Sequence, residues 1–286
     1  MNRLADAQVA VLGLGLMGGS LAGALRGRCR AVVGVARREE TVETALQHGL
    51  IDRGTTDVPS GVREADIAVL ATPVRVILQQ LVDIGPLVPR GCLVMDLGST
   101  KTQIVDEMAC LPDHVQPLGG HPMCGKELSG IEAADPALFR DRTFILTPLE
   151  RTSATALALG RALAEAIGAR PLVLEAGRQD FLAGTLSHLP YLLACALVGT
   201  ADATTSADSA AWEIVASGFR DTSRLAGSDV SMMIDILLTN REQIRKALDR
   251  YQDQLHGLAR LVETGDEDRM RAVFGEFRDK RREMFP

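Results

Sequence analysis

The chain has 286 residues, 46% of them hydrophobic and 24% charged, and it carries a formal net charge of −6. This length suits one large domain or two ordinary ones, and the apolar share argues against disorder. The net negative charge and the aromatic share of only 3% argue against nucleic-acid binding, which needs a basic surface or aromatic rings that stack on bases. We see no apolar run long enough for a membrane span and no signal-peptide core, so we expect a soluble protein of the cytoplasm. The five scattered cysteines include no C-x-x-C pair, so neither a disulfide framework nor a metal site is predicted.

The first predicted element is a buried strand over residues 9–12, followed by glycines in a G-x-G-x-x-G pattern and a helix over 20–25. In such a loop Gly13 permits a tight turn, Gly15 lets the backbone approach a pyrophosphate, and Gly18 lets helix and strand pack closely. The helix N-terminus offers free N–H groups to phosphates. We therefore predict a dinucleotide site at Gly13, Gly15, Leu16, Met17 and Gly18.

The next predicted strand, over 31–35, bears on the choice of cofactor. An NAD site normally carries an acidic side chain at this strand's end, but residues 33–38 contain no carboxylate. Arg37 and Arg38 stand there instead, and guanidinium groups suit a 2′-phosphate. The alternative is a solvated basic turn at a helix start. We predict NADP ahead of NAD, with NAD left open.

Strands and helices then alternate in a way that predicts a mostly parallel, doubly wound α/β sheet. Helices are predicted over 39–48, 74–84, from about 102 to 110 and over 153–167; strands over 66–71, 93–97, 143–147 and 171–174. Thr72 and Pro73 are expected to cap the helix that follows them. Ligands of such sheets bind at the carboxyl ends of the strands. The loops at 13–18, 71–73 and 98–101 are therefore expected along one crevice.

From residue 177 onward the periodicity is helical. We divide the chain into a dinucleotide-binding domain, 1–175, and a helical substrate and dimerisation domain, 176–286. Apolar residues at 244, 248, 251, 255, 258 and 262 form a narrow seam that suits helix packing. A helical segment of this length buries little surface by itself, so we expect a homodimer through these helices.

Three polar clusters are candidates for chemistry. Residues 119–130 are rich in glycine and read as a loop, in which His121 can carry a proton. His188 lies in a helical pattern that Pro190 should kink, where a core histidine and a functional one are equally good readings. The third cluster, 217–227, holds two arginines among glycines and hydroxyls, which suggests carboxylate capture or, alternatively, a salt-bridged loop.

Taken in order, five motifs resemble the prephenate/arogenate dehydrogenase family of tyrosine biosynthesis, and closest among its members the NADP-using arogenate dehydrogenases. They are GLGLMGGS at 13–20, DLGSTK at 96–101, GHPMCG at 120–125, SHLP at 187–190 and GFRDTSR at 218–224. The resemblance implies a Rossmann-type domain followed by a helical dimerisation domain, with a small substrate in the cleft between them. It implies oxidative decarboxylation of a cyclohexadienol, in which hydride leaves the ring carbon bearing the hydroxyl and the ring becomes aromatic.

The resemblance also implies residue roles. His121 matches the base that hydrogen-bonds the ring hydroxyl, and Ser99 matches the serine that helps orient it. Arg224 matches the arginine that binds a substrate carboxylate, His188 matches the motif lining the same pocket, and Glu127 matches an acidic residue that in some members controls access.

Tyr191 departs from the pattern of those members that have a second histidine at this position. A tyrosine offers no cationic partner to a pyruvyl carboxylate, so arogenate is expected ahead of prephenate. One alternative is a β-hydroxyacid dehydrogenase of the 6-phosphogluconate dehydrogenase type, against which stands the absence of lysine from residues 177–200. Another is a non-catalytic NADP-binding sensor, which could have lost Ser99, His121 or Arg224.

Overall fold

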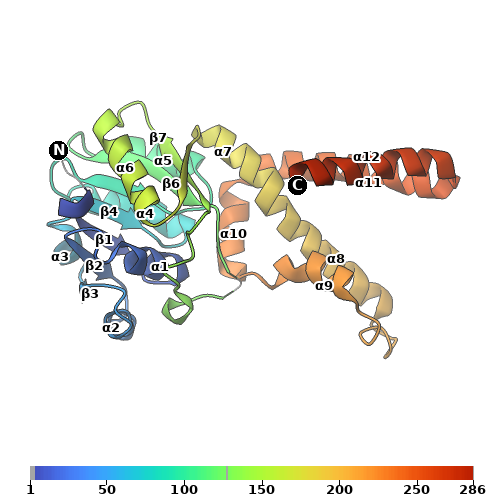
Figure 1. The fold of residues 1–286 in the computed structure, drawn as a ribbon, viewed down its shortest axis with the longest axis horizontal. Helices are drawn as coiled ribbons and strands as arrows, with labels where there is room; N and C mark the ends of the chain where they lie inside the picture. Colours follow the sequence, from blue (N-terminus) through green and yellow to red (C-terminus); the bar gives the residue numbers. More distant parts are fainter. Residues whose placement is uncertain (1–3, 127, 286) are drawn as a thin grey trace.

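The computed structural model describes residues 4–126 and 128–285. Figure 1 shows a sheet covered by helices at one end of the molecule and a set of long helices that extends away from it. The two parts meet along the segment that follows the last strand. The overall shape is therefore elongated, with a large helical surface outside the sheet-containing part.

One sheet of eight strands organises the first part, in the order β3-β2-β1-β4-β5-β6-β7-β8. All neighbouring pairs are parallel except β6 and β7, which are antiparallel. The order reverses direction at β1, which is the switch point where doubly wound sheets bind ligands. The strands are β1 (Gln8–Leu12), β2 (Ala31–Val35), β3 (Arg53–Thr55), β4 (Ile67–Leu70), β5 (Leu93–Asp96), β6 (Gln116–Pro122), β7 (Thr143–Pro148) and β8 (Arg170–Val173).

Two hydrophobic cores lie against the sheet, because the central strands are apolar throughout and are buried on both faces. One core includes residues of α1 (Leu16–Leu25), α2 (Glu39–Gln47) and α6 (Ala154–Ala166). The other includes residues of α3 (Val58–Val62), α4 (Val74–Ile84) and α5 (Thr102–Ala109). The doubly wound α/β class predicted from the alternating pattern is confirmed.

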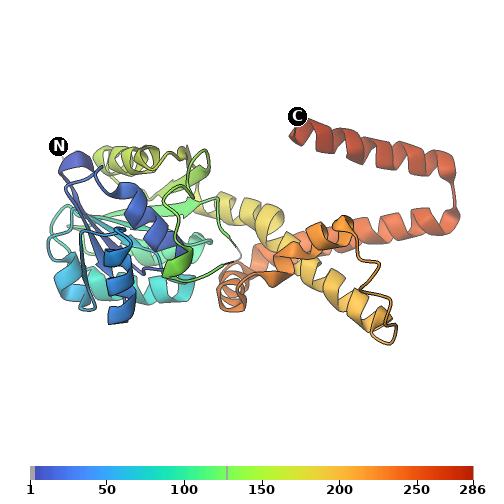
Figure 2. The ribbon, with the colours of Figure 1, turned by 60° about the horizontal axis from the view of Figure 1, so that its bottom comes forward.

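The helical part begins with a long helix that contains α7 (Ala176–Ala183), a π turn (Gly184–His188) and α8 (Leu189–Thr205). It continues with α9 (Ser217–Ser223), a 3-10 turn (Arg224–Gly227), α10 (Val230–Thr239), α11 (Arg241–Thr264) and α12 (Glu267–Met284). Figure 2 shows α11 and α12 as an antiparallel hairpin that projects away from the sheet. No residue of α12 is buried among those the structure describes.

Several local expectations are corrected. His121 lies in strand β6, not in a loop, because Gly119 and Gly120 pack flat against neighbouring groups rather than form a turn. Helix α1 begins at Leu16, four residues before the predicted start, since the glycine loop itself provides its first turn. The hydroxyl of Thr72 donates to Gln80 at 2.7 Å and does not cap α4. Strand β3 and helix α3 were not predicted, and residues 217–227 are helical.

Within the described ranges one helix, Ala176–Thr205, is long and apolar enough to cross a membrane. Its mean hydropathy is 1.6 over its most apolar window. This corrects the expectation that no such run exists. Only 28% of that window is buried. The start of the helix nevertheless carries Gln179, Asp180 and His188, all buried and all bonded to other elements. Its exposed large apolar side chains are Phe181 and Leu186, while those of α8 are half-buried or buried.

Polar contacts join the two parts at the carboxyl ends of the strands. Arg75 of α4 donates from Nε to Asp235 of α10 at 2.6 Å. The hydroxyls of Thr100 and Thr239 lie 2.8 Å apart, and both residues are buried. The helical part is thereby held against the edge where the candidate site lies.

Candidate active site

The glycine loop has the geometry of a phosphate-binding turn. Gly13 has φ +101°, and a Cβ on it would lie 2.8 Å from the carbonyl oxygen of Ala71. A Cβ on Gly18 would lie 1.8 Å from the carbonyl oxygen of Gly13, so only glycine permits this approach of helix to loop. A Cβ on Gly15 would meet nothing within 4 Å, and Gly15 is the N-cap of α1 with no side-chain cap. The open space above Gly15 and the free amides of α1 fit a pyrophosphate.

Of the other predicted cofactor residues, two line a cavity beside this loop and two lie outside it. Thr72 and Pro73 line the same cavity as Gly15, Leu16 and Met17. Arg37 and Arg38 are exposed and follow β2, the strand next to β1; Arg38 is the N-cap residue of α2. They lie outside the cavity lining.

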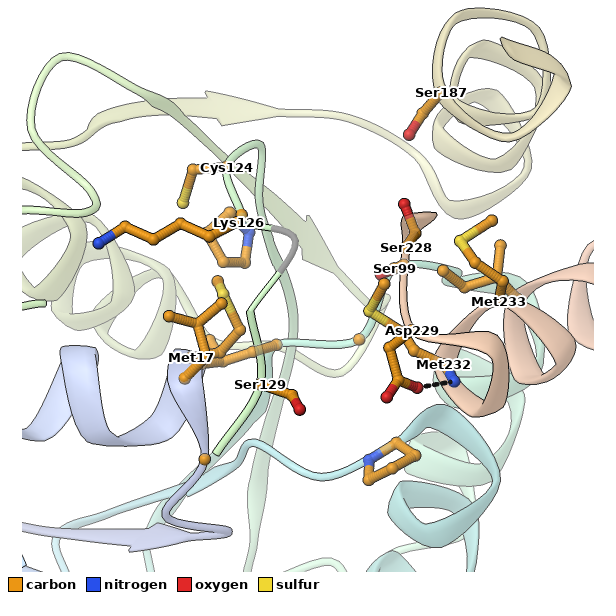
Figure 3. A pocket seen from close by; sticks show the side chains of 18 of the residues that line it. Met17, Ser99, Cys124, Lys126, Ser129, Ser187, Ser228, Asp229, Met232 and Met233 are labelled. Atoms are coloured by element: carbon orange, nitrogen blue, oxygen red, sulfur yellow. Dashed lines mark hydrogen bonds between the residues drawn. The ribbon is translucent and has the colours of Figure 1, made fainter. Parts of the chain in front are cut away.

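A cavity of about 650 Å³ lies between the glycine loop and the helical part. Figure 3 shows Met17 on one side and Ser99, Ser187, Ser228 and Met232 on the other. The lining also includes His121, His188, Tyr191 and Arg224. The structure therefore brings together every predicted catalytic and substrate residue except Glu127, which lies outside the described residues.

Gln179 contacts His121 on the side of the ring that faces the protein interior. The Nε2 of Gln179, on α7, lies 2.7 Å from the Nδ1 of His121 and donates to the carbonyl oxygen of Ser99 at 3.1 Å. His121 is 7% exposed, and Gln179 is fully buried. Because Nδ1 is occupied inside the protein, Nε2 is the nitrogen on the cavity side. Burial first, then the charge of Lys101 and, where it is protonated, that of His188 hold the pKa of His121 well below its ordinary value.

A buried ion pair underlies this arrangement. The Nζ of Lys101 donates to Oδ2 of Asp96, and neither side chain is exposed. Asp96 also accepts from the amides of Gly98 at 2.7 Å and Gly120 at 3.0 Å. Burial lowers the pKa of Lys101 and raises that of Asp96, while their mutual attraction and the two amide donors favour the charged pair. Asp96 thereby fixes β6 one residue before His121.

The close packing before His121 requires a glycine at position 120, where a Cβ would lie 2.4 Å from the carbonyl oxygen of Asp96. A Cβ on Gly119 would lie 3.2 Å from Cδ of Lys101, so a side chain there would need its neighbours to shift by a few tenths of an ångström. Gly120 is therefore a condition for β6 to lie against the ion pair.

His188 is buried at the end of the π turn and also lines the cavity. Its Nδ1 lies 3.2 Å from Nδ2 of Asn240, whose other hydrogen goes to the carbonyl oxygen of Asp180 at 2.8 Å. The Nε2 of His188 is buried without a hydrogen-bond partner among the described residues. Burial lowers the pKa of His188 to about 4, so the ring is neutral near pH 7.

The sequence reasoning missed Gln179, Asp180 and Asn240, and it assigned no role to the pair of Asp96 and Lys101. All five are buried polar side chains that act through other residues of the site. A signal existed for Asp96, because a charged residue at the end of a buried strand needs a partner, and Lys101 follows it closely in the chain. No local pattern distinguishes Gln179 or Asn240 from other polar residues of a helix.

The fold and the site together define a two-domain protein of the dinucleotide-binding class, with a histidine-containing cleft between a Rossmann-type sheet and a helical part. Residues 21–173 match the family model for the nucleotide-binding domain of prephenate dehydrogenase, and residues 176–276 match that for its dimerisation domain. The chain belongs to the prephenate dehydrogenase family of oxidoreductases, which confirms the resemblance seen in its motifs.

Individual relatives agree with this assignment. Prephenate dehydrogenase of Bacillus subtilis is 32% identical over 98% of this chain and 76% of the relative. Prephenate dehydrogenase of Aquifex aeolicus, in complex with hydroxyphenyl propionate and NAD+, is 30% identical, with a TM-score of 0.91 over 99% of this chain and 100% of the relative. Arogenate dehydrogenase of Synechocystis is also 30% identical, with a TM-score of 0.84 over 97% of this chain and 99% of the relative. Membership of this family argues against the β-hydroxyacid dehydrogenase reading.

Proposed function

We propose that this protein catalyses the NADP-dependent oxidative decarboxylation of arogenate, and of prephenate to a lesser extent, as a cytoplasmic homodimer. The observation that carries the proposal is the placement of His121. Its Nδ1 is engaged inside the protein, its ring lines the cavity, and that cavity reaches from the glycine loop to the helical part. A substrate bound there lies between a base and a cofactor site.

The residues present fit a nicotinamide dinucleotide. Gly15 leaves open space over the N-terminus of α1, and Thr72 and Pro73 continue the cavity wall from the carboxyl end of β4. When bound, the oxidised nicotinamide supplies the acceptor for a hydride. This chain's own residues bind and orient the substrate and receive its hydroxyl proton.

His121 is the group that takes the hydroxyl proton while the carbon bearing that hydroxyl loses hydride, and carbon dioxide then departs as the ring becomes aromatic. Ser99, half-buried in the cavity wall, is placed to orient the same hydroxyl. His188 lines the cavity on the helical side and is placed to contact a polar substrate group. Arg224 lines the cavity and supplies the charge for a carboxylate.

The preference for arogenate rests on Tyr191, which lines the cavity in place of a cationic side chain. A phenol offers a hydrogen bond but no positive charge. The relatives include both a prephenate and an arogenate dehydrogenase at equal identity, so they support either substrate.

The preference for NADP rests on Arg37 and Arg38. Both are exposed just beyond β2, where the ribose of a dinucleotide bound over β1 would reach. Replacing both by serine should lower the preference for NADP over NAD by at least about tenfold. An unchanged preference would remove the cofactor argument.

The homodimer is supported by apolar side chains left uncovered along the helical hairpin. Leu255, Val262, Phe274 and Phe277 are each 45% exposed or more. The matching family model is that of a dimerisation domain. Sedimentation of the protein should give twice the mass of one chain, and Phe277→Glu should reduce it to a single chain if the hairpin forms the interface.

The deciding experiment is initial-rate reduction of NADP and of NAD, each with arogenate and with prephenate. We expect the fastest turnover with arogenate and NADP. His121→Asn should lower kcat by at least about 100-fold, whereas His256→Asn, an exposed histidine of α11, should leave it unchanged. A folded wild-type protein that binds NADP but turns over neither substrate would favour the sensor reading.

A further inference from the structure

The amide of Gln179 connects the two residues assigned to the chemistry. Its Nε2 lies 2.7 Å from Nδ1 of His121 and 3.1 Å from the carbonyl oxygen of Ser99. A primary amide nitrogen has two hydrogens, one for each contact. A carbonyl oxygen can only accept, so the contact with Ser99 determines which end of the amide faces His121.

This orientation determines where His121 carries its hydrogen. Since Gln179 donates to Nδ1, that nitrogen holds a lone pair, and the neutral imidazole has its hydrogen on Nε2. The Nε2 faces the cavity. The resting enzyme therefore presents an N–H donor to a ligand, whereas a base needs the lone pair on that atom.

The amide is also incompletely satisfied. The Oε1 of Gln179 is buried without a hydrogen-bond partner among the described residues. Turning the amide over would bring Oε1 against Nδ1 as an acceptor, but would also bring it against the carbonyl oxygen of Ser99. The turned amide would also put its nitrogen in the place where Oε1 has no partner, so the observed orientation is the favoured one in the free enzyme.

We propose that Gln179 is a positioning residue that selects the tautomer of His121: it holds the Nε2–H form in the free enzyme, and the amide must turn over before Nε2 can accept a proton. The kinetic part of this inference rests on the proposed function. The tautomer in the free enzyme does not depend on it.

The charged groups around His121 act in the same direction. Lys101, at the start of α5, and His188, in the π turn, both disfavour an imidazolium. Asp96 of β5 is paired with Lys101, and Asp180 of α7 is committed to backbone amides. The facing strand β7 (Thr143–Pro148) contributes no titratable side chain. Donation by Gln179 also stabilises only the neutral ring, because an imidazolium would direct its own N–H at the amide hydrogens.

The test uses the ligand-free protein with 15N-labelled histidine, in which NMR reports the protonation of each ring nitrogen. The His121 signals are those lost in His121→Asn. We expect an unprotonated Nδ1 and a protonated Nε2 in the wild type. In Gln179→Glu the carboxylate accepts from Nδ1–H, so the hydrogen should move to Nδ1 and the pKa of His121 should rise by at least about one unit.

Gln179→Met, which keeps the volume and removes the donor, should raise the pKa of His121 by less. Gln103→Met is the matched control, because Gln103 also reaches the helical part, through the carbonyl oxygen of Thr239, without touching His121. A wild-type hydrogen on Nδ1, or a pKa that is unchanged in both Gln179 variants or equally raised in Gln103→Met, would overturn the inference.

Turnover separates this inference from the proposed function. With arogenate, the acid limb of kcat/KM should move to higher pH in Gln179→Glu while KM stays within about twofold. An acid limb that stays in place while the NMR pKa moves would overturn the kinetic part of the inference. If the NMR results are as expected but no substrate is turned over, the tautomer assignment stands and the proposed function fails.

Discussion

The carboxylate of Asp180 caps the helix that begins after Lys101. One of its oxygens accepts from the amide of Lys101 at 2.6 Å and the other from the amide of Thr102 at 2.8 Å. Asp180 belongs to α7 and the amides to α5, so a side chain of the helical part completes a helix of the sheet-containing part. Gln179 is the neighbour of Asp180 and contacts His121 from the same turn of α7. The position of this one turn therefore determines both the cap of α5 and the contact with His121.

Replacing this cap should be costly because Asp180 and the amide of Lys101 are buried. We expect Asp180→Ala to lower the free energy of unfolding by roughly 2 kcal/mol, from the lost cap and the unsatisfied donors. Glu175→Ala is the control, since Glu175 caps α7 in the same way but is exposed, and it should cost less than about 1 kcal/mol. Urea unfolding measures both. Equal losses would mean that water satisfies the α5 amides.

Two alanine substitutions in the glycine loop should have opposite effects. Gly15→Ala places a methyl group in open space, so the protein should keep its stability. The methyl group would occupy the space for the phosphate, so the affinity for the dinucleotide should fall by at least about tenfold. Gly18→Ala meets the carbonyl oxygen of Gly13 and should destabilise the fold by at least about 2 kcal/mol. Thermal unfolding and calorimetric titration with NADP distinguish the two. Unchanged NADP affinity in Gly15→Ala would argue against a cradle here.

The buried pair of Asp96 and Lys101 should behave as a unit. Lys101→Met leaves a buried carboxylate without its counter-ion and should cost about 3–5 kcal/mol. The double variant Asp96→Asn/Lys101→Met removes both charges and should be the more stable of the two. A double-mutant cycle by chemical denaturation measures the coupling. Strictly additive losses would show that the two charges do not depend on one another.

The buried histidines make stability depend on pH. The pKa of His188 is lowered from 6.5 in the unfolded chain to about 4 in the folded protein. Below pH 6.5 the unfolded chain therefore binds a proton that the folded protein does not, so stability falls as pH falls from 6.5 toward 4. The loss reaches on the order of 3 kcal/mol at the lower end.

Urea unfolding between pH 7 and 5 measures this effect. His188→Gln, which keeps a hydrogen-bonding side chain beside Asn240, should flatten the pH dependence, leaving the share due to His121. His256→Gln alters an exposed histidine and should leave the slope unchanged. The same slope in His188→Gln as in the wild type would show that His188 is charged in the folded protein.

The parts of the fold that were predicted correctly are those with a strong local pattern. The strand before Gly13, the helix after Pro73 and the strand ending at Asp96 each combine an apolar run with a clear boundary. His121 was assigned to a loop because two preceding glycines usually indicate a turn. Here they permit close packing of β6 on a buried ion pair, which is a tertiary cause with no local signature.

The candidate site shows the same limit. Ser99, His121, His188 and Arg224 were named from motifs, and the structure brings them around one cavity. Gln179 escaped notice, because its importance comes from two atoms 58 and 80 positions away in the chain. Glycine conformations and buried strands are encoded locally, whereas the partners of a buried amide are determined only when the two parts of the protein meet.

The shape of the site depends on the number of residues in the π turn at Gly184–His188. A π turn holds one residue more than the α-helical turn it replaces, and so acts as an insertion that the helix absorbs without a loop. Deleting one of the residues 185–187 would restore a regular α-helical turn while the helix on either side keeps its place. Gln179 and Asp180 before the turn and Tyr191 after it would therefore stay where they are. The extra residue widens only the turn that carries Ser187 and His188 into the cavity wall. A one-residue deletion here is thus expected to change the helical wall of the cavity and to leave the dinucleotide site intact.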